Sequence, residues 1–454
     1  MSTASDNTGP LTSPEQLLGA FTAGCKPREA WRIGTEHEKI GFRLDTHRPV
    51  PYAGDRGIRR TLELLAAEGW ELEFEAGNPI ALKRGAASIT LEPGGQLELS
   101  GEPLISVHDT CQEVADHLRL LKKVRDELHI GFLGLGFQPK WRLEDIPWMP
   151  KGRYAVMRRY MPQVGAHGLD MMLRTATVQV NLDFDSEADM ARKMRIGCCL
   201  QPVVTALFAA SPFVDGKPSG YLSYRSRCWL DTDPARTGIP AMVFDDHFGF
   251  AHYVDWLLDA PMYFIIRGGR YVDCAGQSFR DFLEGRLAVL PGEHPGMDDW
   301  ELHATTAYPE VRLKHILEMR GADAGGKPWI CALPALWKGL LYEEEAMRKA
   351  WEMVADWSWE EVVSMREAAT RTGLQTPFRD TTLLQLAEVM LDIARSGLAR
   401  LNCLNRHGRD ETVHLAPLIE AVNSGRTQAE QWLDAYAHQW DENIDVIFSH
   451  CALP

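Results

Sequence analysis

The sequence predicts an α+β protein in which helices flank a mainly antiparallel sheet. Several segments alternate polar and apolar residues with the period of two that a half-buried strand requires, and TATVQVNLDF at 175–184 is the clearest. The segment SITLEPGGQLELSG at 88–101 predicts a hairpin, because PGG supplies a turn between two alternating arms. Longer segments with helical spacing of apolar residues lie between and after these strands, which favours α+β.

The composition is that of an ordinary globular protein, with 454 residues, 45% hydrophobic and 24% charged. A formal net charge of −15 argues against a broad nucleic-acid surface, which needs basic patches. The N-terminus has no basic segment followed by an apolar run, and no stretch of about 18 apolar residues occurs. We therefore expect no secretory signal, no membrane span and no nucleic-acid partner.

The nine cysteines are scattered and show no CxxC spacing. That usage is typical of a reducing cytosol with mostly free thiols, and not of a disulfide framework. We therefore expect a cytoplasmic protein.

The chain is long enough for two or three average domains, but it contains no internal repeat and no low-complexity linker. We predict a flexible tail over 1–13 and a single catalytic domain over 14–454. Beyond about residue 334 the pattern becomes mostly helical and rich in Trp.

Helices are predicted where apolar residues recur at helical spacing behind a capping residue. They cover 14–24, 58–71, a segment capped by Asp109 and Gln112 that reaches Leu128, 186–211 with Ser186 and Asp189 as a capping box, a segment of the C-terminal part that Gly397 ends, and a last one capped by Thr427 and Glu430.

Glu36 and Glu38 lie two residues apart in the strand-like segment WRIGTEHEKIGF, so both side chains point to one face. Two like charges 4 Å apart repel by roughly 4 kcal/mol at an effective dielectric near 20. Solvent could screen such a pair, or a hard divalent cation could lie between the carboxylates.

Three further glutamates lie on predicted strands. Glu92 and Glu98 belong to the hairpin, and Glu318 belongs to VRLKHILEMR at 311–320, predicted as one strand. That strand also places Arg312, Lys314 and Arg320 on the face of Glu318.

A half-exposed sheet explains any single one of these strands. The five carboxylates taken together favour a site for Mg²⁺ and an anionic substrate. Glycoside hydrolysis would need only two carboxylates, whereas the accompanying Arg and Lys residues fit phosphoryl transfer better. No GxxxxGK[ST] loop occurs, so ATP use would not be of the P-loop kind.

Eight blocks in the same order resemble the plant-type glutamate–cysteine ligases, which also occur in proteobacteria, over residues 14 to 450. They are GTEHEKIGF, LEPGGQLELSG, GFLGLGFQPKW, MPKGRYAVMRRYMPQVG, LDMMLRTATVQVNLDF, SYRSRCWLDTDPARTG, PEVRLKHILEMRGAD and GLQTPFRD. The resemblance implies a glutamine-synthetase-like catalytic fold. It also implies ATP-dependent joining of the γ-carboxylate of glutamate to the amine of cysteine, through a γ-glutamyl phosphate, as the first step of glutathione synthesis. A related carboxylate–amine ligase with another amine acceptor remains the alternative.

The resemblance also assigns roles to residues. Glu36, Glu38, Glu92, Glu98 and Glu318 become ligands of two or more Mg²⁺ ions. Arg225 and Arg320 become catalytic groups that meet phosphate or the substrate carboxylate, because guanidinium groups bind such anions bidentately. Candidates for binding substrate or nucleotide are Arg174, Lys151, Arg153, Tyr154 and Gln179. We expect Glu36→Gln and Glu318→Gln to abolish turnover with little loss of folding.

The resemblance implies glutamate, cysteine and ATP as substrates. We expect the protein to be a monomer or a weak homodimer. Plant members are controlled through two cysteine pairs, and Cys111 with Cys331 matches one pair as a possible redox pair. Cys274 matches half of the other, whose partner position is Val289, so that bridge cannot form. For Cys111 and Cys331, two free thiols in a reducing cytosol remain the other possibility.

Overall fold

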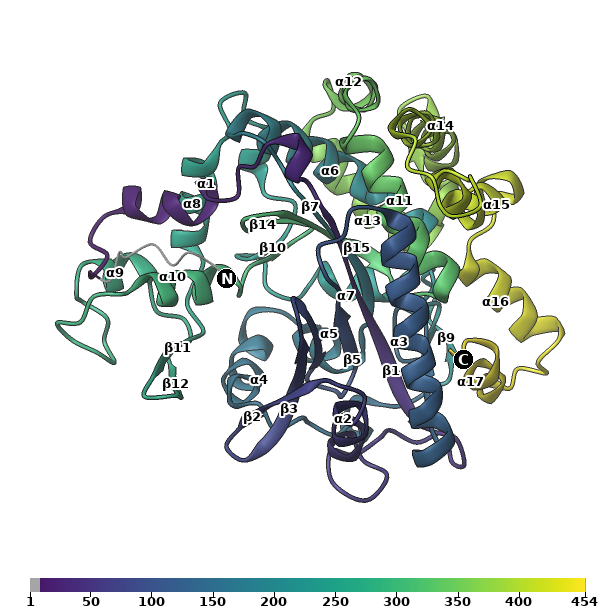
Figure 1. The fold of residues 1–454 in the computed structure, drawn as a ribbon, viewed down its shortest axis with the longest axis horizontal. Helices are drawn as coiled ribbons and strands as arrows, with labels where there is room; N and C mark the ends of the chain where they lie inside the picture. The colour runs from purple at the N-terminus through teal and green to yellow at the C-terminus, as the bar shows by residue number, and fades with distance from the viewer. Residues whose placement is uncertain (1–8, 454) are drawn as a thin grey trace.

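The computed structural model describes residues 9–453 and has a nine-stranded sheet at its centre (Figure 1). The strand order is β14-β15-β7-β1-β5-β4-β3-β2, and β6 pairs with the second half of β1. Neighbouring strands in this sheet are antiparallel, which confirms the predicted α+β class. The strands are β1 Ile33–Arg43, β2 Glu71–Glu75, β3 Asn78–Arg84, β4 Ala87–Leu91, β5 Leu97–Ser100, β6 Ile130–Leu133, β7 Thr177–Leu182, β14 Val311–Leu313 and β15 Leu317–Asp323.

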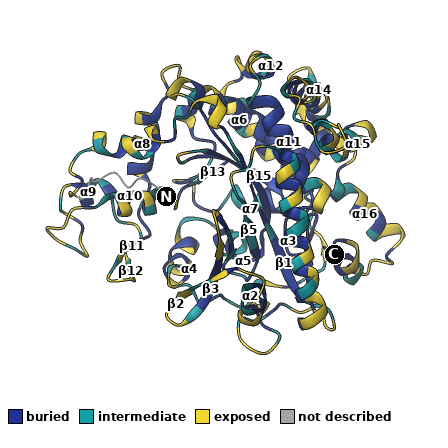
Figure 2. Cartoon of the chain, in the orientation of Figure 1, coloured by how far each residue is buried: buried dark blue, intermediate teal, exposed yellow. Residues whose placement is uncertain are grey.

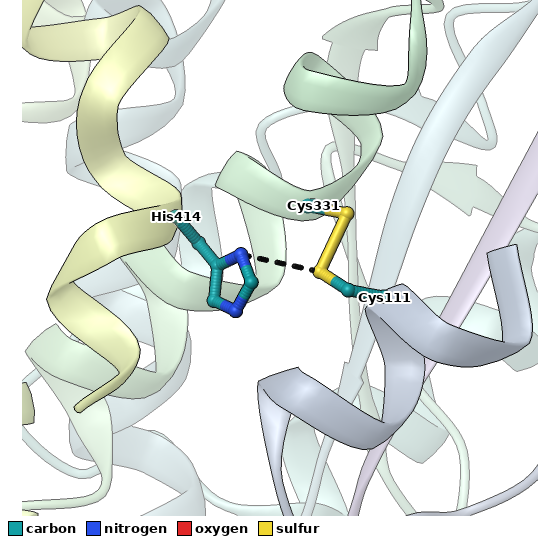
Figure 3. A group of neighbouring side chains, drawn as sticks. All are labelled: Cys111, Cys331 and His414. Carbon is teal, nitrogen blue, oxygen red and sulfur yellow. Dashed lines mark hydrogen bonds between the residues drawn. A yellow bond between two sulfur atoms is a disulfide. The ribbon is translucent and has the colours of Figure 1, made fainter. Parts of the chain in front are cut away.

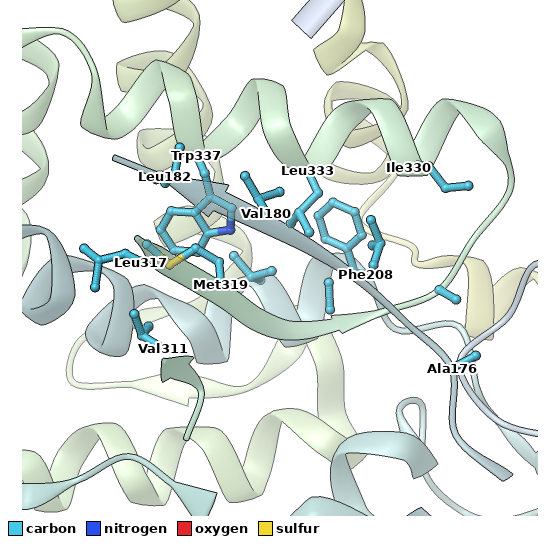
Figure 4. Close-up of a cluster of buried hydrophobic side chains, with 14 of the residues drawn as sticks. Ala176, Val180, Leu182, Phe208, Val311, Leu317, Met319, Ile330, Leu333 and Trp337 are labelled. Atoms are coloured by element: carbon cyan, nitrogen blue, oxygen red, sulfur yellow. The ribbon is translucent and has the colours of Figure 1, made fainter. Parts of the chain in front are cut away.

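One face of the sheet is apolar and is covered by long helices (Figures 1 and 2). These are α3 (Val107–Leu128), α6 (Glu187–Leu207) and α11 (Lys327–Leu341), and α14 (Leu383–Leu401) packs against α11 from outside. Figure 4 shows the core where α11 meets the sheet: Trp337 and Leu333 face Val180 of β7 and Met319 of β15. All four are buried, so the hydrophobic effect holds this layer to the sheet.

The remaining elements pack outside these long helices or surround the sheet edges and its other face. None of the described helices is long and apolar enough to cross a membrane. The helices are α1 Gly19–Thr22, α2 Ile58–Ala66, α4 Gly152–Val164, α5 Gly168–Arg174, α7 Tyr224–Trp229, α8 Phe250–Asp259, α9 Phe279–Leu283, α10 Met297–Ala304, α12 Glu344–Val354, α13 Trp359–Thr372, α15 Ala416–Ser424, α16 Gln428–His438 and α17 Ile447–His450. Short strands pair as β8 Phe213–Val214 with β9 Lys217–Pro218, β10 Thr237–Gly238 with β13 Tyr308–Pro309, β11 Phe264–Arg267 with β12 Arg270–Asp273, and β16 Pro377–Phe378 with β17 Thr381–Thr382.

The predicted hairpin is present as β4 and β5, and the backbone N–H of Glu92 donates to the carbonyl of Gln96 across its turn at 2.9 Å. The prediction of a single strand over 311–320 was wrong. The chain turns back after β14, where the N–H of Lys314 donates to the carbonyl of Ile316 at 2.8 Å, and β15 returns beside it. His315 and Ile316 interrupt the period of two at the turn, and this interruption is the local sign of the reversal that the prediction overlooked.

Several helix boundaries also differ from the prediction, and α2, predicted over 58–71, ends at Ala66. Ser106, and not Asp109, caps α3, because its hydroxyl accepts the N–H of Asp109. Gly397 does not end a helix: α14 continues to Leu401 and stops at Asn402, whose φ of 50° is left-handed. Helix 14–24 is a 3₁₀ helix over Pro14–Leu18 followed by α1.

Half of the capping box predicted at Ser186 is present: its hydroxyl accepts the N–H of Asp189, but Asp189 Oδ2 accepts the N–H of Asp185 and not that of Ser186. Thr427 with Glu430 forms the predicted capping box. The predicted tail over 1–13 lies partly outside the described residues. Within its described part, Leu11 is buried and donates its N–H to the carbonyl of Pro295 at 2.8 Å.

Candidate active site

Strand register brings the predicted glutamates together on the sheet face opposite the long helices. Glu36 of β1 lies directly opposite Gln179 of β7. Two residues further along β1, Glu38 lies directly opposite Glu98 of β5. Residues opposite one another in a ladder share a face, so the period of two in β1 fixes the orientation of both carboxylates.

Beside this face lies a cavity of about 360 Å³. Helices α4 and α7 contribute to its wall, as do α5 and the segment before β13. The predicted residues that line it are Glu36, Glu38, Glu92, Glu98, Lys151, Arg153, Tyr154, Gln179, Arg225 and Arg320.

Three of the lining carboxylates are held close to one another inside the protein. The pKa of Glu38 is raised well above its usual value by burial, and next by the charges of Glu98 and Glu92. Burial and then Glu92 raise the pKa of Glu98. Burial and then Glu318 raise the pKa of Glu36. A cation placed among these groups would lower all three pKa values, as expected of a metal site.

Neutral donors hold two of these carboxylates in place. Asn181 Nδ2 donates to Glu36 Oε1 at 2.7 Å, and the backbone N–H of Thr177 donates to Glu38 Oε2 at 3.0 Å. The remaining oxygen of each carboxylate can therefore accept a further donor or a cation.

Glu318 of β15 lies on the same face, next to the edge strand β14. Its carboxylate contacts cationic side chains from both strands and from the turn between them. Arg312 donates to both of its oxygens at 2.6 and 2.8 Å, Lys314 to Oε1 at 3.0 Å and Arg320 to Oε2 at 2.6 Å. Glu318 is fully buried and does not line the cavity. Its pKa lies well below the usual value, because these charges outweigh the effect of burial.

The two predicted catalytic arginines lie next to each other on the cavity wall. Arg225 Nη2 donates to the backbone carbonyl of Arg320 at 2.8 Å, and Arg320 also donates to Gln179. Within the described part of the chain, Arg225 Nε is buried and has no hydrogen-bond partner. Burial lowers the pKa of Arg225, which reflects the cost of its desolvated charge. An anion in the cavity would offset that cost.

Helix α4 presents a second cationic group to the cavity. Lys151 Nζ and Tyr154 Oη both donate to the backbone carbonyl of Leu91, at 2.7 and 2.6 Å. Burial, followed by the charge of Arg153, lowers the pKa of Lys151 to about 8. Arg153 Nε is another buried donor that has no partner among the described residues.

Arg174 is not brought to the cavity. It is buried, donates to Asp170 at 3.1 Å and to the carbonyl of Trp141 at 2.8 Å, and pairs with Asp215. These contacts are those of a structural ion pair between α5 and neighbouring loops.

Sequence reasoning left out several residues that belong to this site. Asn181 shares the polar face of its strand with Gln179, so the period of two could have included it. Trp229 and Tyr308 line the cavity, with ring centroids 5.9 Å apart. Trp229 carries no local pattern that distinguishes a Trp facing a cavity from one in the core.

The carboxylates that line the cavity are suitable ligands for Mg²⁺, but their spacing limits how many of them can bind one ion. Carboxylate oxygens are the ligands that this ion prefers. Over residues 9–453, however, no three glutamate or aspartate residues each place an oxygen within 4.8 Å of the other two. Mg²⁺ characteristically takes one or two carboxylates and completes its shell with substrate phosphates and water, which agrees with this spacing.

Cys111 and Cys331 form a disulfide, with Cα atoms 5.5 Å apart, and His414 lies beside it (Figure 3). The structure therefore contains the disulfide and not the two free thiols that were the other possibility. Cys274 is buried and free, and Val289 is exposed.

Comparison with known proteins agrees with this geometry. The sequence model described as "Glutamate-cysteine ligase family 2" matches residues 32–450. The chain is 53% identical over 444 residues to the chloroplastic glutamate–cysteine ligase of Medicago truncatula, covering 97% of this chain and 85% of that one. It is 54% identical to glutamate–cysteine ligase B, chloroplastic, of Oryza sativa subsp. japonica, covering 97% and 87%.

Two solved structures share the fold. A glutamate–cysteine ligase from Francisella tularensis in complex with AMP has a TM-score of 0.56 at 13% identity, covering 93% of this chain and 87% of that one. A bifunctional glutathione synthetase from Pasteurella multocida has a TM-score of 0.53 at 13% identity, covering 95% and 53%.

These relatives correct one prediction. The expectation of a cytoplasmic protein was wrong, because similar proteins from Medicago truncatula, rice and Arabidopsis thaliana are chloroplastic. Scattered cysteines without CxxC spacing do not distinguish one compartment from another, so this signal could not locate the protein.

Proposed function

Because the chain belongs to glutamate–cysteine ligase family 2, we propose that it joins the γ-carboxylate of L-glutamate to the amine of L-cysteine with ATP. The observation that carries this proposal is a sheet face on which half-buried carboxylates lie beside arginines, one of them the buried Arg225, around one cavity. Glycoside hydrolysis would not need the arginines, whereas transfer of a phosphoryl group between anions needs both sets.

A carboxylate does not acylate an amine in water without activation. An oxygen of the glutamate γ-carboxylate attacks the γ-phosphorus of ATP, ADP leaves, and a γ-glutamyl phosphate forms. The cysteine amine then attacks the acyl carbon, loses a proton, and expels inorganic phosphate. Both steps spread negative charge over phosphate oxygens, so fixed cationic groups aimed at that charge lower the barrier.

The cationic groups proposed for this role are Arg225 and Arg320, with Arg153 and Lys151 across the cavity. Their unpartnered nitrogens support it, since Arg225 Nε and Arg153 Nε are buried without a protein acceptor in the described chain. Tyr154 and Gln179 would orient substrate or nucleotide from the same wall.

Mg²⁺, when bound, would neutralise charge between the triphosphate and the protein. We place it at Glu36, Glu38, Glu92 and Glu98, which line the cavity. More than one ion fits this set, since each takes one or two carboxylates. Glu318 differs from the other four, because three cations already contact its oxygens. We assign it to positioning Arg320.

The test of the function is phosphate release by the purified protein in the presence of ATP and Mg²⁺. Release should require glutamate and cysteine together, and the product should carry a γ-glutamyl bond to the cysteine amine. Turnover with other amines but none with cysteine would replace this function with that of a ligase for another acceptor. Activity without ATP would exclude both.

A further inference from the structure

Away from the cavity, three potential metal ligands converge on the helical side of the sheet (Figure 3). Cys111 lies on α3, Cys331 on α11, and His414 on the 3₁₀ helix Glu411–Leu415. One donor atom from each lies within 4.8 Å of the other two. Both cysteines are buried, whereas His414 is half-buried, so the group lies inside the protein with one edge near solvent.

A chain of hydrogen bonds fixes which nitrogen of His414 faces the sulfurs. His108 Nε2 lies 3.2 Å from the carbonyl oxygen of Cys403, which can only accept, so this nitrogen carries the proton. In neutral His108 the other nitrogen, Nδ1, then accepts from His414 Nε2 at 2.9 Å. His414 Nδ1 is left with a lone pair, 3.4 Å from Cys111 Sγ.

A buried carboxylate ties together the same three elements that carry the ligands. Glu411 Oε1 accepts the N–H of Val107, the first residue of α3, at 2.6 Å, and Lys338 Nζ of α11 at 2.7 Å. Glu411 is fully buried and lies one turn before His414. These contacts do not involve sulfur, so they would hold the three ligands near one another after the disulfide is reduced.

Two thiolates and one imidazole form a donor set for Zn²⁺ and similar thiophilic cations, with water completing four-coordination. Two thiolate charges neutralise a divalent cation, which makes the complex compatible with burial. A metal-bound imidazole characteristically donates its other N–H to a protein acceptor, as His414 does toward His108.

We propose that Cys111, Cys331 and His414 of the reduced protein bind a thiophilic divalent cation, with His108 as a positioning residue. A sulfur in a disulfide is not a thiolate, so the metal and the disulfide exclude each other. The site is separate from the catalytic one: α11 packs on β1 and β7, whose other face carries Glu36 and Gln179. It therefore does not depend on the proposed function.

The experiment titrates Cd²⁺ into full-length protein reduced with a phosphine, with Mg²⁺ in excess to occupy the carboxylates. Thiolate-to-cadmium absorption in the ultraviolet reports binding, and competition with a chromophoric chelator gives the affinity for Zn²⁺. Wild type should bind one equivalent that Cys331→Ser and His414→Ala lack. His108→Ala should bind it about 10- to 100-fold more weakly, as for loss of an outer-shell partner.

Two controls keep the result interpretable. Cys25→Ser removes a half-buried thiol on another segment and should keep the equivalent. His414→Ala should still form the Cys111–Cys331 disulfide, which shows that it folds. Equal binding by wild type, Cys331→Ser and His414→Ala would overturn the proposal, and so would retention of the equivalent by wild type whose disulfide is intact.

Discussion

At the scale of single residues, the carboxylates of Glu38 and Glu98 lie directly opposite each other. This arrangement lowers the stability of the sheet, and a role in function explains it. Like charges facing each other across a ladder destabilise a sheet by up to about 1 kcal/mol. Glu98→Gln should therefore raise the free energy of unfolding of the metal-free protein by about that amount, and should abolish Mg²⁺-dependent turnover. Chemical denaturation and phosphate release measure the two effects.

The control is Glu73→Gln, which removes a carboxylate paired with Lys83 on the exposed strand β2 and should change neither. A Glu98→Gln protein that is less stable than wild type without Mg²⁺ would contradict the assignment of strain to this pair.

The same carboxylates make stability depend on pH. Burial raises the pKa values of Glu36, Glu38 and Glu98, so the folded state binds their protons more tightly than the unfolded state. Their contribution is fully present below the unfolded pKa of about 4.3 and is lost as the pH rises through the raised folded values. The metal-free protein should lose stability over that window, Mg²⁺ should restore it, and a urea series from pH 4 to 8 tests both.

Glu318 should respond differently from the other glutamates. Its two oxygens accept from three cations and it is fully buried, so Glu318→Gln leaves those charges uncompensated. We expect a loss of about 3–5 kcal/mol in the free energy of unfolding, together with loss of turnover. The sequence alone predicted little effect on folding, because the register that brings Arg312 opposite Glu318 is not visible in it.

Glu63→Gln is the matched control, since Glu63 pairs with two arginines on the exposed side of α2. Wild-type stability in Glu318→Gln would mean that the three cations find other partners.

At the scale of elements, the crossing of α11 and α14 requires two glycines. A Cβ on Gly397 would lie 2.0 Å from the carbonyl oxygen of Gly339. Gly397→Ala should therefore force the helices apart and cost about 1–3 kcal/mol. Gly19→Ala is the control, because nothing lies within 4 Å of its Cβ position, and thermal unfolding compares the two. An unchanged melting temperature in Gly397→Ala would show that α14 shifts without penalty.

The same crossing explains which elements could be predicted. The β4–β5 hairpin and β7 follow from local alternation and turn residues, and both were found from the sequence. Gly397 looked like a helix stop because its packing partner, Gly339, lies far away in the chain. Contacts of that kind leave no local pattern.

At the scale of the whole molecule, the C-terminal segment packs against strands β1 and β6 of the sheet. Phe448 of α17 packs on Phe42 of β1 at 5.1 Å between ring centroids, and Leu453 donates its N–H to the carbonyl of Phe132 on β6 at 2.8 Å. Phe448→Ala should cost about 3–5 kcal/mol, as for a fully buried aromatic residue. Phe74→Ala, at a side chain 59% exposed, should cost little by comparison in urea denaturation. Equal stability of the two variants would contradict this stabilising role.

The positions of the predicted site residues also depend on packing between distant parts of the chain. Ten predicted residues line one cavity: strand alternation gave the faces of the glutamates, Gln179 and Arg320, whereas the family resemblance supplied Lys151, Arg153, Tyr154 and Arg225. Arg174 and Glu318 do not line it, because their partners come from other elements. Local alternation gives the face of a side chain, whereas tertiary packing decides whether a cavity lies in front of it.

The alternation along β1 has an evolutionary consequence. Glu36 and Glu38 face the cavity, while the intervening His37 and the next residue, Lys39, are buried toward α3, where Lys39 Nζ lies 3.0 Å from His117 Nε2. Inserting or deleting one residue before Glu36 would exchange the two sets, placing imidazole and ammonium where carboxylates belong. Lineages should therefore accept substitutions in this strand far more readily than changes in its length.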